Sequence, residues 1–253
     1  MAEVCKKVGL SFALILAFGT SANAACDSIF CINGNVGVGG VYNNFGGNST
    51  ANGNLKSVYG AIDINLLFVK RLKLGIGIKA GAGSMRVSGS SLSNMPSRTM
   101  GAFGNISFRS GINMLSLESP LYINFIFNSS TNASKLSLIQ SISVFGIELE
   151  GKKLLDEKAK LLYSIGSGAA VGLYDFDGYP INFTLPITDR HGYSIFGSLG
   201  LEYALNNYLG FYAKGIANFY DIPASNLVQL NNQTISFPAA RAWNAMVEVG
   251  LTF

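Results

Sequence analysis

The chain of 253 residues is poor in charge: Asp, Glu, Lys and Arg make up 13% of it, about half of the ~25% typical of globular domains. Its formal net charge of +4 is too small to suggest a nucleic-acid partner. It has one histidine and three cysteines, and the sequence offers no metal-ligand cluster, phosphate-binding loop or Ser-His-Asp arrangement. We therefore expect no metal and no cofactor.

A long apolar run is also missing beyond the N-terminus, although 49% of the residues are hydrophobic. A transmembrane helix needs roughly 20 consecutive apolar residues, so the apolar residues must be spread over short segments. Strands that alternate lipid-facing and lumen-facing side chains distribute them in this way. The 30 glycines, many of them within apparent strands, suit a curved sheet with a crowded interior.

The first 24 residues have the pattern of a secretory signal peptide. Lys6 and Lys7 precede an apolar run, residues 8–18, and Ala22 and Ala24 form an A-x-A cleavage site. Cleavage there would leave residues 25–253 as the mature chain. The apolar run is short for a retained anchor helix, which is the alternative.

Two cysteines follow the cleavage site closely. Cys26 and Cys31 could close a small disulfide ring just before the first strand, because the periplasm is oxidising. The alternative is a pair of free thiols.

Apolar residues alternate with polar or small ones up to the last residue of the chain. The apolar positions are Trp243, Ala245, Val247, Val249, Leu251 and Phe253. This segment resembles the C-terminal strand of bacterial outer-membrane β-barrel proteins, whose terminal Phe is recognised by the barrel assembly machinery. The resemblance implies an assembly signal in Trp243, Val247, Val249, Leu251 and Phe253, and that machinery as a partner.

Ten strands can be assigned by the same alternation, and they predict an all-β fold. We expect a transmembrane antiparallel up-and-down β-barrel over residues 25–253, with eight strands if the middle hairpin is misassigned. Connections alternate between long and short, as in outer-membrane barrels. In the middle we expect a short strand, 121–127, a turn or loop, 128–134, and a strand, 136–149, with a β-bulge near Phe145.

The second phase of these strands carries the few charges of the chain. Those expected in the lumen are Asp63, Lys73, Lys79, Arg109, Glu148, Glu202, Lys214 and Glu248. Four are basic and four are acidic, so in a narrow barrel they would pair across the lumen and fill it. The alternative is that they line a thin water column.

One loop contains residue types used in catalysis. Asp175 and Asp177 precede it and Asp189 and His191 follow it, which is similar to the paired Asp and Asp-His residues of omptin proteases. The resemblance implies that His191 would activate a water and Asp189 would orient its ring. Here a single loop joins both pairs, whereas omptins bring them from opposite walls.

These patterns favour a non-enzymatic protein of the bacterial outer membrane with a structural or surface-interaction role exerted through its extracellular loops. A narrow porin-like channel is the alternative, and an omptin-like hydrolase at the rim is the third hypothesis. We expect a monomer surrounded by outer-membrane lipid, with host or envelope ligands at the loops and no nucleic acid.

Overall fold

The computed structural model describes residues 29–46, 52–69, 71–88, 98–116, 119–134, 138–176, 183–184, 192–206, 208–224, 228–230, 233–235 and 239–253. The predicted signal peptide and Cys26 lie outside these residues. Asp177, Asp189 and His191 also lie outside them.

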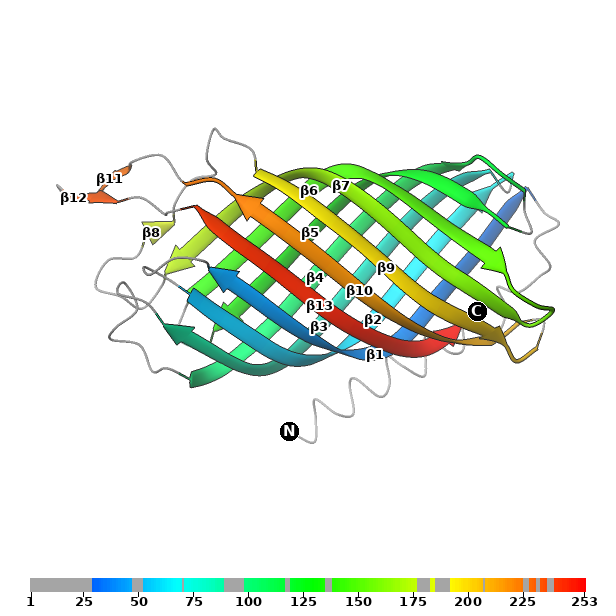
Figure 1. Cartoon of the computed structure of the whole chain (residues 1–253), viewed down its shortest axis with the longest axis horizontal. Helices are drawn as coiled ribbons and strands as arrows, with labels where there is room; N and C mark the ends of the chain where they lie inside the picture. Colours follow the sequence, from blue (N-terminus) through cyan, green and yellow to red (C-terminus); the bar gives the residue numbers. More distant parts are fainter. Residues whose placement is uncertain are drawn as a thin grey trace.

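Ten long antiparallel strands form a closed barrel (Figure 1). They are β1 (Phe30–Gly46), β2 (Asn52–Phe68), β3 (Leu72–Ser88), β4 (Arg98–Asn113), β5 (Leu121–Ser134), β6 (Leu138–Leu154), β7 (Ala159–Phe176), β9 (Gly192–Ala204), β10 (Gly210–Ile222) and β13 (Ala240–Thr252). Sequential strands pair with each other, and β1 pairs with β13 to close the ring. The predicted fold class and the count of ten are confirmed, and the eight-stranded alternative is wrong.

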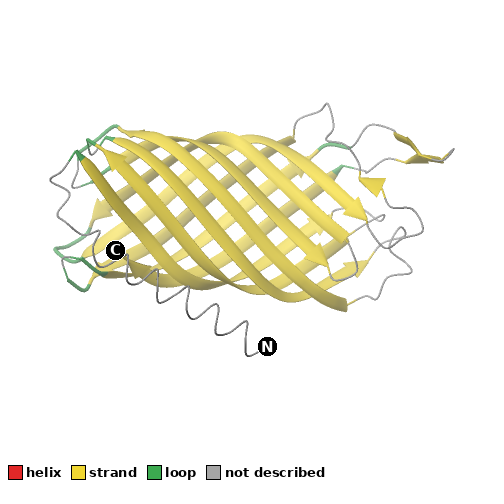
Figure 2. Ribbon diagram, turned by 180° about the vertical axis from the view of Figure 1, so that it is seen from behind, coloured by secondary structure: helices red, strands yellow, loops and turns green. Residues whose placement is uncertain are grey.

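The two ends of the barrel differ in their connections, as Figure 2 shows. At one end three short strands lie in the long connections: β8 (Phe183–Thr184), β11 (Val228–Leu230) and β12 (Gln233–Ile235). At the other end the connections 69–71, 155–158 and 205–209 are tight turns, whereas 114–120 is longer. Two of the tight turns are closed by side chains. Asp156 accepts hydrogen bonds from the backbone N–H groups of Lys158 and Ala159 at 2.8 and 2.7 Å, and Asn206 does the same for Tyr208 and Leu209. Such Asx turns favour short hairpins.

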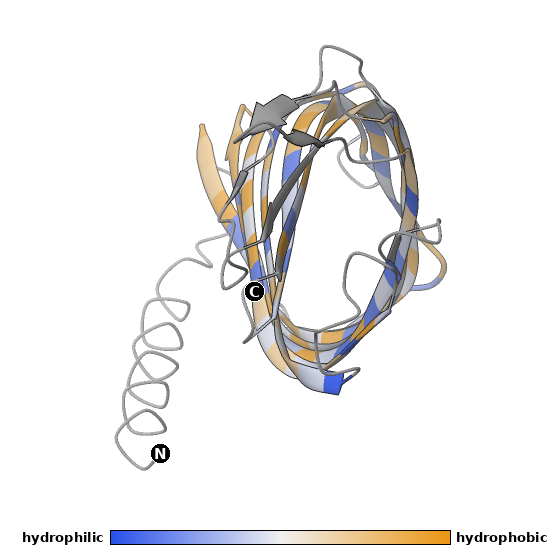
Figure 3. Ribbon diagram, turned by 90° about the vertical axis from the view of Figure 1, so that its left-hand side faces the viewer, coloured by the Kyte–Doolittle hydropathy of each residue, from blue (hydrophilic) through white to orange (hydrophobic). Residues whose placement is uncertain are grey.

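Every second residue of each strand points outward. Most of these outward residues are apolar, and the outer face of the barrel is therefore apolar. Val58, Phe125 and Val247 are 73%, 72% and 67% exposed, values that a soluble domain would not tolerate so often. Viewed from one end, the wall alternates between hydrophobic and hydrophilic residues along each strand (Figure 3). In the described part of the chain, no helix is long and apolar enough to cross a membrane.

The middle of the chain differs from the sequence prediction in two respects. First, β5 continues through Ser134, where we expected a turn. Its outward hydroxyls find partners on β6: Ser129 Oγ accepts from Ser143 Oγ at 3.1 Å, and Thr131 Oγ1 lies 3.0 Å from Ser141 Oγ. A polar segment can therefore remain a strand, because neighbouring side chains satisfy its hydroxyls.

Second, β6 has no bulge. Its register with β5 is unbroken from Leu121↔Gly151 to Ala133↔Ile139. Ile142 and Val144, 3% and 2% exposed, therefore share the inward phase with Glu148. We inferred the bulge from the rule that apolar residues face lipid. On the side of the long connections this rule fails, because inward residues of the barrel are apolar there as well.

Apolar side chains form a layer in the lumen on the side of the long connections, where the buried amides of Asn43, Asn132 and Gln140 also lie. The layer is built from inward residues of all parts of the wall: Val41, Leu55, Tyr59, Ala61, Met85, Val87, Phe103, Ile126, Ile142, Val144, Ala170, Phe196, Tyr220, Ile222, Ala242 and Met246. Leu55 and Met85 are fully buried. This layer is a packed core inside a membrane barrel, as expected when few strands leave little interior space.

Candidate functional site: the charge network of the lumen

Glu248 on β13 is the most enclosed charge in the barrel, at 1% exposure. Its Oε1 lies 2.9 Å from Lys214 Nζ and accepts from the Tyr212 hydroxyl at 2.8 Å. Its Oε2 pairs with Lys79 Nζ and accepts from the Tyr59 hydroxyl at 3.1 Å. The carboxylate thus has four donors from β2, β3 and β10, which compensates for its removal from water.

Arg109 on β4 links a second set of acids to the same cluster. Its guanidinium lies 3.5 Å from Asp63 Oδ1 and 3.3 Å from Glu148 Oε2. Asp63 Oδ2 lies in turn 3.6 Å from Lys214 Nζ. The chain of ion pairs therefore runs across the lumen from β6 through β4 and β2 to β10.

A third group of ion pairs lies nearer the tight turns. Lys73 on β3 pairs with Glu150 on β6. Glu202 on β9 accepts from Lys152 at 2.7 Å and lies 3.6 Å from Lys160. These partners are more exposed than Glu248, with 40% and 37% of the Lys152 and Lys160 side chains accessible, so salt screens them more strongly.

All eight charges that we expected in the lumen lie on the inward phase, and each has at least one ion-pair partner there. Sequence reasoning missed Glu150, Lys152 and Lys160, because they lie after the predicted strand 136–149, in a segment that we expected to be a connection between strands. The alternation offered a signal for two of them. Glu150 and Lys152 continue the inward phase of Glu148, so they could have been assigned to the lumen.

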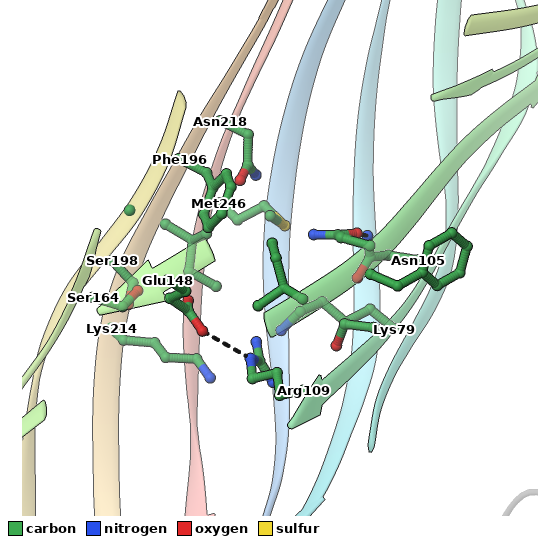
Figure 4. A pocket seen from close by; sticks show the side chains of 16 residues that line it. Lys79, Asn105, Arg109, Glu148, Ser164, Phe196, Ser198, Lys214, Asn218 and Met246 are labelled. Carbon is green, nitrogen blue, oxygen red and sulfur yellow. Dashed lines mark hydrogen bonds and ion pairs between the residues drawn. The ribbon is translucent and has the colours of Figure 1, made fainter. Parts of the chain in front are cut away.

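A small cavity of about 80 Å³ lies between the charges and the apolar layer. Figure 4 shows Arg109 and Glu148 joined across its lower side, with Phe196 and Met246 above. Its polar lining and size suit a few ordered waters, since one water needs only about 10–15 Å³ of such volume.

Two larger cavities open toward the tight turns. One of about 360 Å³ is lined by Lys73, Tyr122, Glu150 and Lys152, among others, and one of about 220 Å³ is lined by Lys160, Glu202 and Phe253, among others. The two cavities share Asn33, Asn35, Lys152 and Lys160. They therefore form one polar vestibule between the charge network and the tight turns.

The remaining predicted sites are only partly within the described residues. Of the four residues of the hydrolase hypothesis, only the backbone of Asp175 is described, opposite Ile139 on β6 and Thr184 on β8. Cys31 is disulfide-bonded, and its pairing with Cys26 stays a prediction. Within the described ranges no cluster of His, Cys, Asp or Glu could hold a metal ion.

The predicted assembly signal lies on β13, which closes the barrel. Trp243, Val247 and Val249 are outward and 42%, 67% and 44% exposed. Phe253 follows the end of the strand, and its backbone exchanges hydrogen bonds of 2.8 and 2.9 Å with Gly34.

The fold is similar to those of solved bacterial outer-membrane proteins. The outer membrane protease OmpT from Escherichia coli has a TM-score of 0.63 at 12% identity, covering 88% of this chain and 96% of that one. The translocator domain of autotransporter NalP from Neisseria meningitidis has a TM-score of 0.44 at 9% identity, covering 98% and 97% of the two chains. Ail, the attachment invasion locus protein of Yersinia pestis, has a TM-score of 0.35 at 10% identity, covering 88% and 99%.

No protein-family model matches the chain, and no curated protein does. The fold therefore defines the class: the protein is an all-β barrel of the bacterial outer-membrane type. Its apolar outer face and this class fit a location in the outer membrane.

Proposed function

We propose that the protein is a closed outer-membrane barrel without enzymatic activity. Its role would be structural or surface-binding and would be exerted through the long connections. The observation that supports this proposal best is the apolar layer, whose members include Leu55, Met85 and Phe103 at 3% exposure or less. Ions cross apolar constrictions poorly because they must give up hydration without a replacement.

Conductance tests the proposal most directly. Residues 25–253 would be refolded into detergent, checked by heat-modifiable gel migration and inserted into a planar bilayer. We expect a folded protein that gives no conductance steps. Steady, reproducible steps from the unmodified chain would show that the lumen is open and that the proposal is wrong.

A matched pair of variants tests whether the apolar layer is the barrier to ion flow. The double variant Met85→Ala, Phe103→Ala shortens two inward side chains of the apolar layer and should produce measurable steps. The control Met100→Ala, Phe108→Ala removes the same residue types from the outer face, where they are 65% and 44% exposed. It should remain silent if the layer is the barrier.

A narrow channel is the second candidate, supported by the polar vestibule of about 360 and 220 Å³. If the protein conducts, reversing Lys79 or Glu202 should change the ion selectivity, because both charges lie in the lumen. If the role is confined to the surface, neither charge reversal should change the function of the protein. Exchange of the long connections should then change it.

A rim hydrolase is the third candidate, supported by the residue types Asp175, Asp177, Asp189 and His191. The similarity to OmpT concerns the fold alone. His191→Ala should abolish any peptidase activity while leaving gel migration unchanged. A folded wild-type barrel that cleaves no peptide would remove this candidate.

A further inference from the structure

Three basic side chains interrupt the apolar outer face near the long connections. Lys56 on β2, Arg86 on β3 and Arg98 on β4 are exposed and share the outward phase of their strands with apolar residues such as Val58 and Met100. They therefore point away from the lumen, toward the membrane surface. We call these three residues the rim patch.

The sheet register brings the members of the rim patch together. Arg86 lies directly opposite Arg98. Lys56 lies opposite Ser84, whose hydroxyl accepts a hydrogen bond from Arg98 Nε at 3.0 Å. Because neighbouring strands are about 4.8 Å apart, the three cationic groups are within reach of one headgroup.

This arrangement is unfavourable without an anion. Like charges directly opposite each other on a sheet are destabilising, and no member of the rim patch has an ion-pair partner among the described residues. Arg241 on β13 offers the contrast: it is also outward and is 77% exposed, but its Nε lies 3.8 Å from Asp221 Oδ2.

Aromatic residues place the rim patch at the membrane surface. Lys56 Nζ lies 5.6 Å from the centre of the Tyr42 ring, which packs at 5.1 Å against the Trp243 ring. Outward Tyr and Trp side chains favour the interface between hydrocarbon and water. The three cations thus lie at the depth of lipid headgroups.

We propose that the rim patch binds the phosphate groups of a phosphorylated lipid in the outer leaflet. Two arginines in register present guanidinium groups that suit bidentate contacts with phosphate oxygens. The acyl chains of the same lipid would lie on the apolar face directly below. This inference goes beyond the proposed function and does not depend on what the long connections bind.

The test uses the refolded chain in detergent and titrates diphosphorylated lipid A, with binding followed by calorimetry. We expect Arg86→Gln, Arg98→Gln to weaken binding about tenfold, since an exposed charge contact is worth up to a factor of about five. Arg241→Gln is the matched control, because it removes an outward charge outside the rim patch. It should change the Kd by less than about twofold.

Three results would overturn the proposal. Equal losses in Arg241→Gln and in the double variant would indicate a general charge effect. Equal affinity for lipid A without its phosphates would exclude phosphate recognition. Inorganic phosphate that binds as tightly as the lipid, with the same dependence on Arg86 and Arg98, would indicate a site for the free ion.

Folding can be checked separately in the same variants. Removing one of two opposed like charges should leave the lipid-free barrel at least as stable as the wild type. Loss of heat-modifiable migration in Arg86→Gln would show that this arginine is needed for the fold, and it would contradict the proposal that it is held for a ligand.

Discussion

At the scale of single residues, Glu248 accepts from more strands than the other acids of its ion-pair network. It is one of three acids in the same ion-pair network, but it alone has donors from three strands, with Tyr59, Lys79, Tyr212 and Lys214 around it. Deleting one partner of a buried ion pair is costly because the remaining charges stay desolvated.

Glu248→Gln should therefore destabilise the barrel by about 3–5 kcal/mol, since it leaves Lys79 and Lys214 short of an acid. Urea unfolding in detergent, followed by tryptophan fluorescence, measures the change. Glu157→Gln, which alters an exposed carboxylate in a tight turn, is the control and should have little effect. A loss below about 1 kcal/mol for Glu248→Gln would contradict the assigned role.

Glycines at the inner wall make room for this cluster. A methyl group at Gly37 on the inward phase of β1 would collide with the Tyr212 hydroxyl and the Val249 carbonyl, whereas one at Gly60, which is exposed on the outward phase of β2, would meet nothing within 4 Å. Both glycines are in strands, so replacing either with alanine restricts the backbone to a similar extent. The two positions differ in the space that is available to a side chain.

Gly37→Ala should accordingly destabilise the protein by more than about 1 kcal/mol, because overpacking displaces Tyr212 from Glu248. Gly60→Ala should be neutral or stabilising by up to about 1 kcal/mol, because alanine restricts the unfolded chain. Unfolding midpoints of the two variants decide the matter, and equal effects would refute the packing argument.

At the scale of elements, the tight turns depend on side chains that substitute for backbone partners. Asp156, in the connection between β6 and β7, accepts two backbone N–H bonds, and these bonds hold the pKa of its carboxyl below the ordinary value. A depressed pKa contributes stability above the unfolded-state value, and this contribution is lost as the pH falls through the folded-state value.

Asp156→Ala should thus lower the unfolding midpoint at neutral pH. The difference from the wild type should shrink as the pH falls below the ordinary aspartate value of 3.8. Midpoints measured across this range test the sign. A difference that grows on acidification would show that another group controls the turn.

At the scale of the whole molecule, closure depends on β13, which pairs with both β1 and β10. The last backbone pairing joins Phe253 to Gly34 and uses no side chain. Spontaneous folding should therefore need the strand but not the terminal ring, whereas assembly in cells would need the ring if it is recognised.

Phe253→Ser separates the two requirements. We expect near-normal refolding into detergent and a marked loss of folded protein in the outer membrane of an expressing cell. Heat-modifiable migration measures both. Thr252→Ala is the control, and an equal loss in cells for this control would argue against recognition of the terminal Phe.

Much of this molecule could be predicted from period-two patterning. In the stretches 62–66 of β2, 72–83 of β3 and 247–251 of β13, apolar residues alternate with polar or small ones, so the outward face, the inward charges and the closing strand could be assigned correctly. Each local choice in these stretches agrees with the global barrel, because a period of two places alternate residues on opposite faces.

Period-two patterning was thus sufficient to predict the number of long strands, the inward position of the predicted charges and the class of fold. The pairing of the strands was needed to show that Ile142 and Val144 face the lumen and that Asn128 to Ser134 belong to a strand. The hydrophobicity of a side chain does not distinguish contact with lipid from contact with a packed interior. In this barrel both environments are apolar, and the register between strands determines which one each side chain enters.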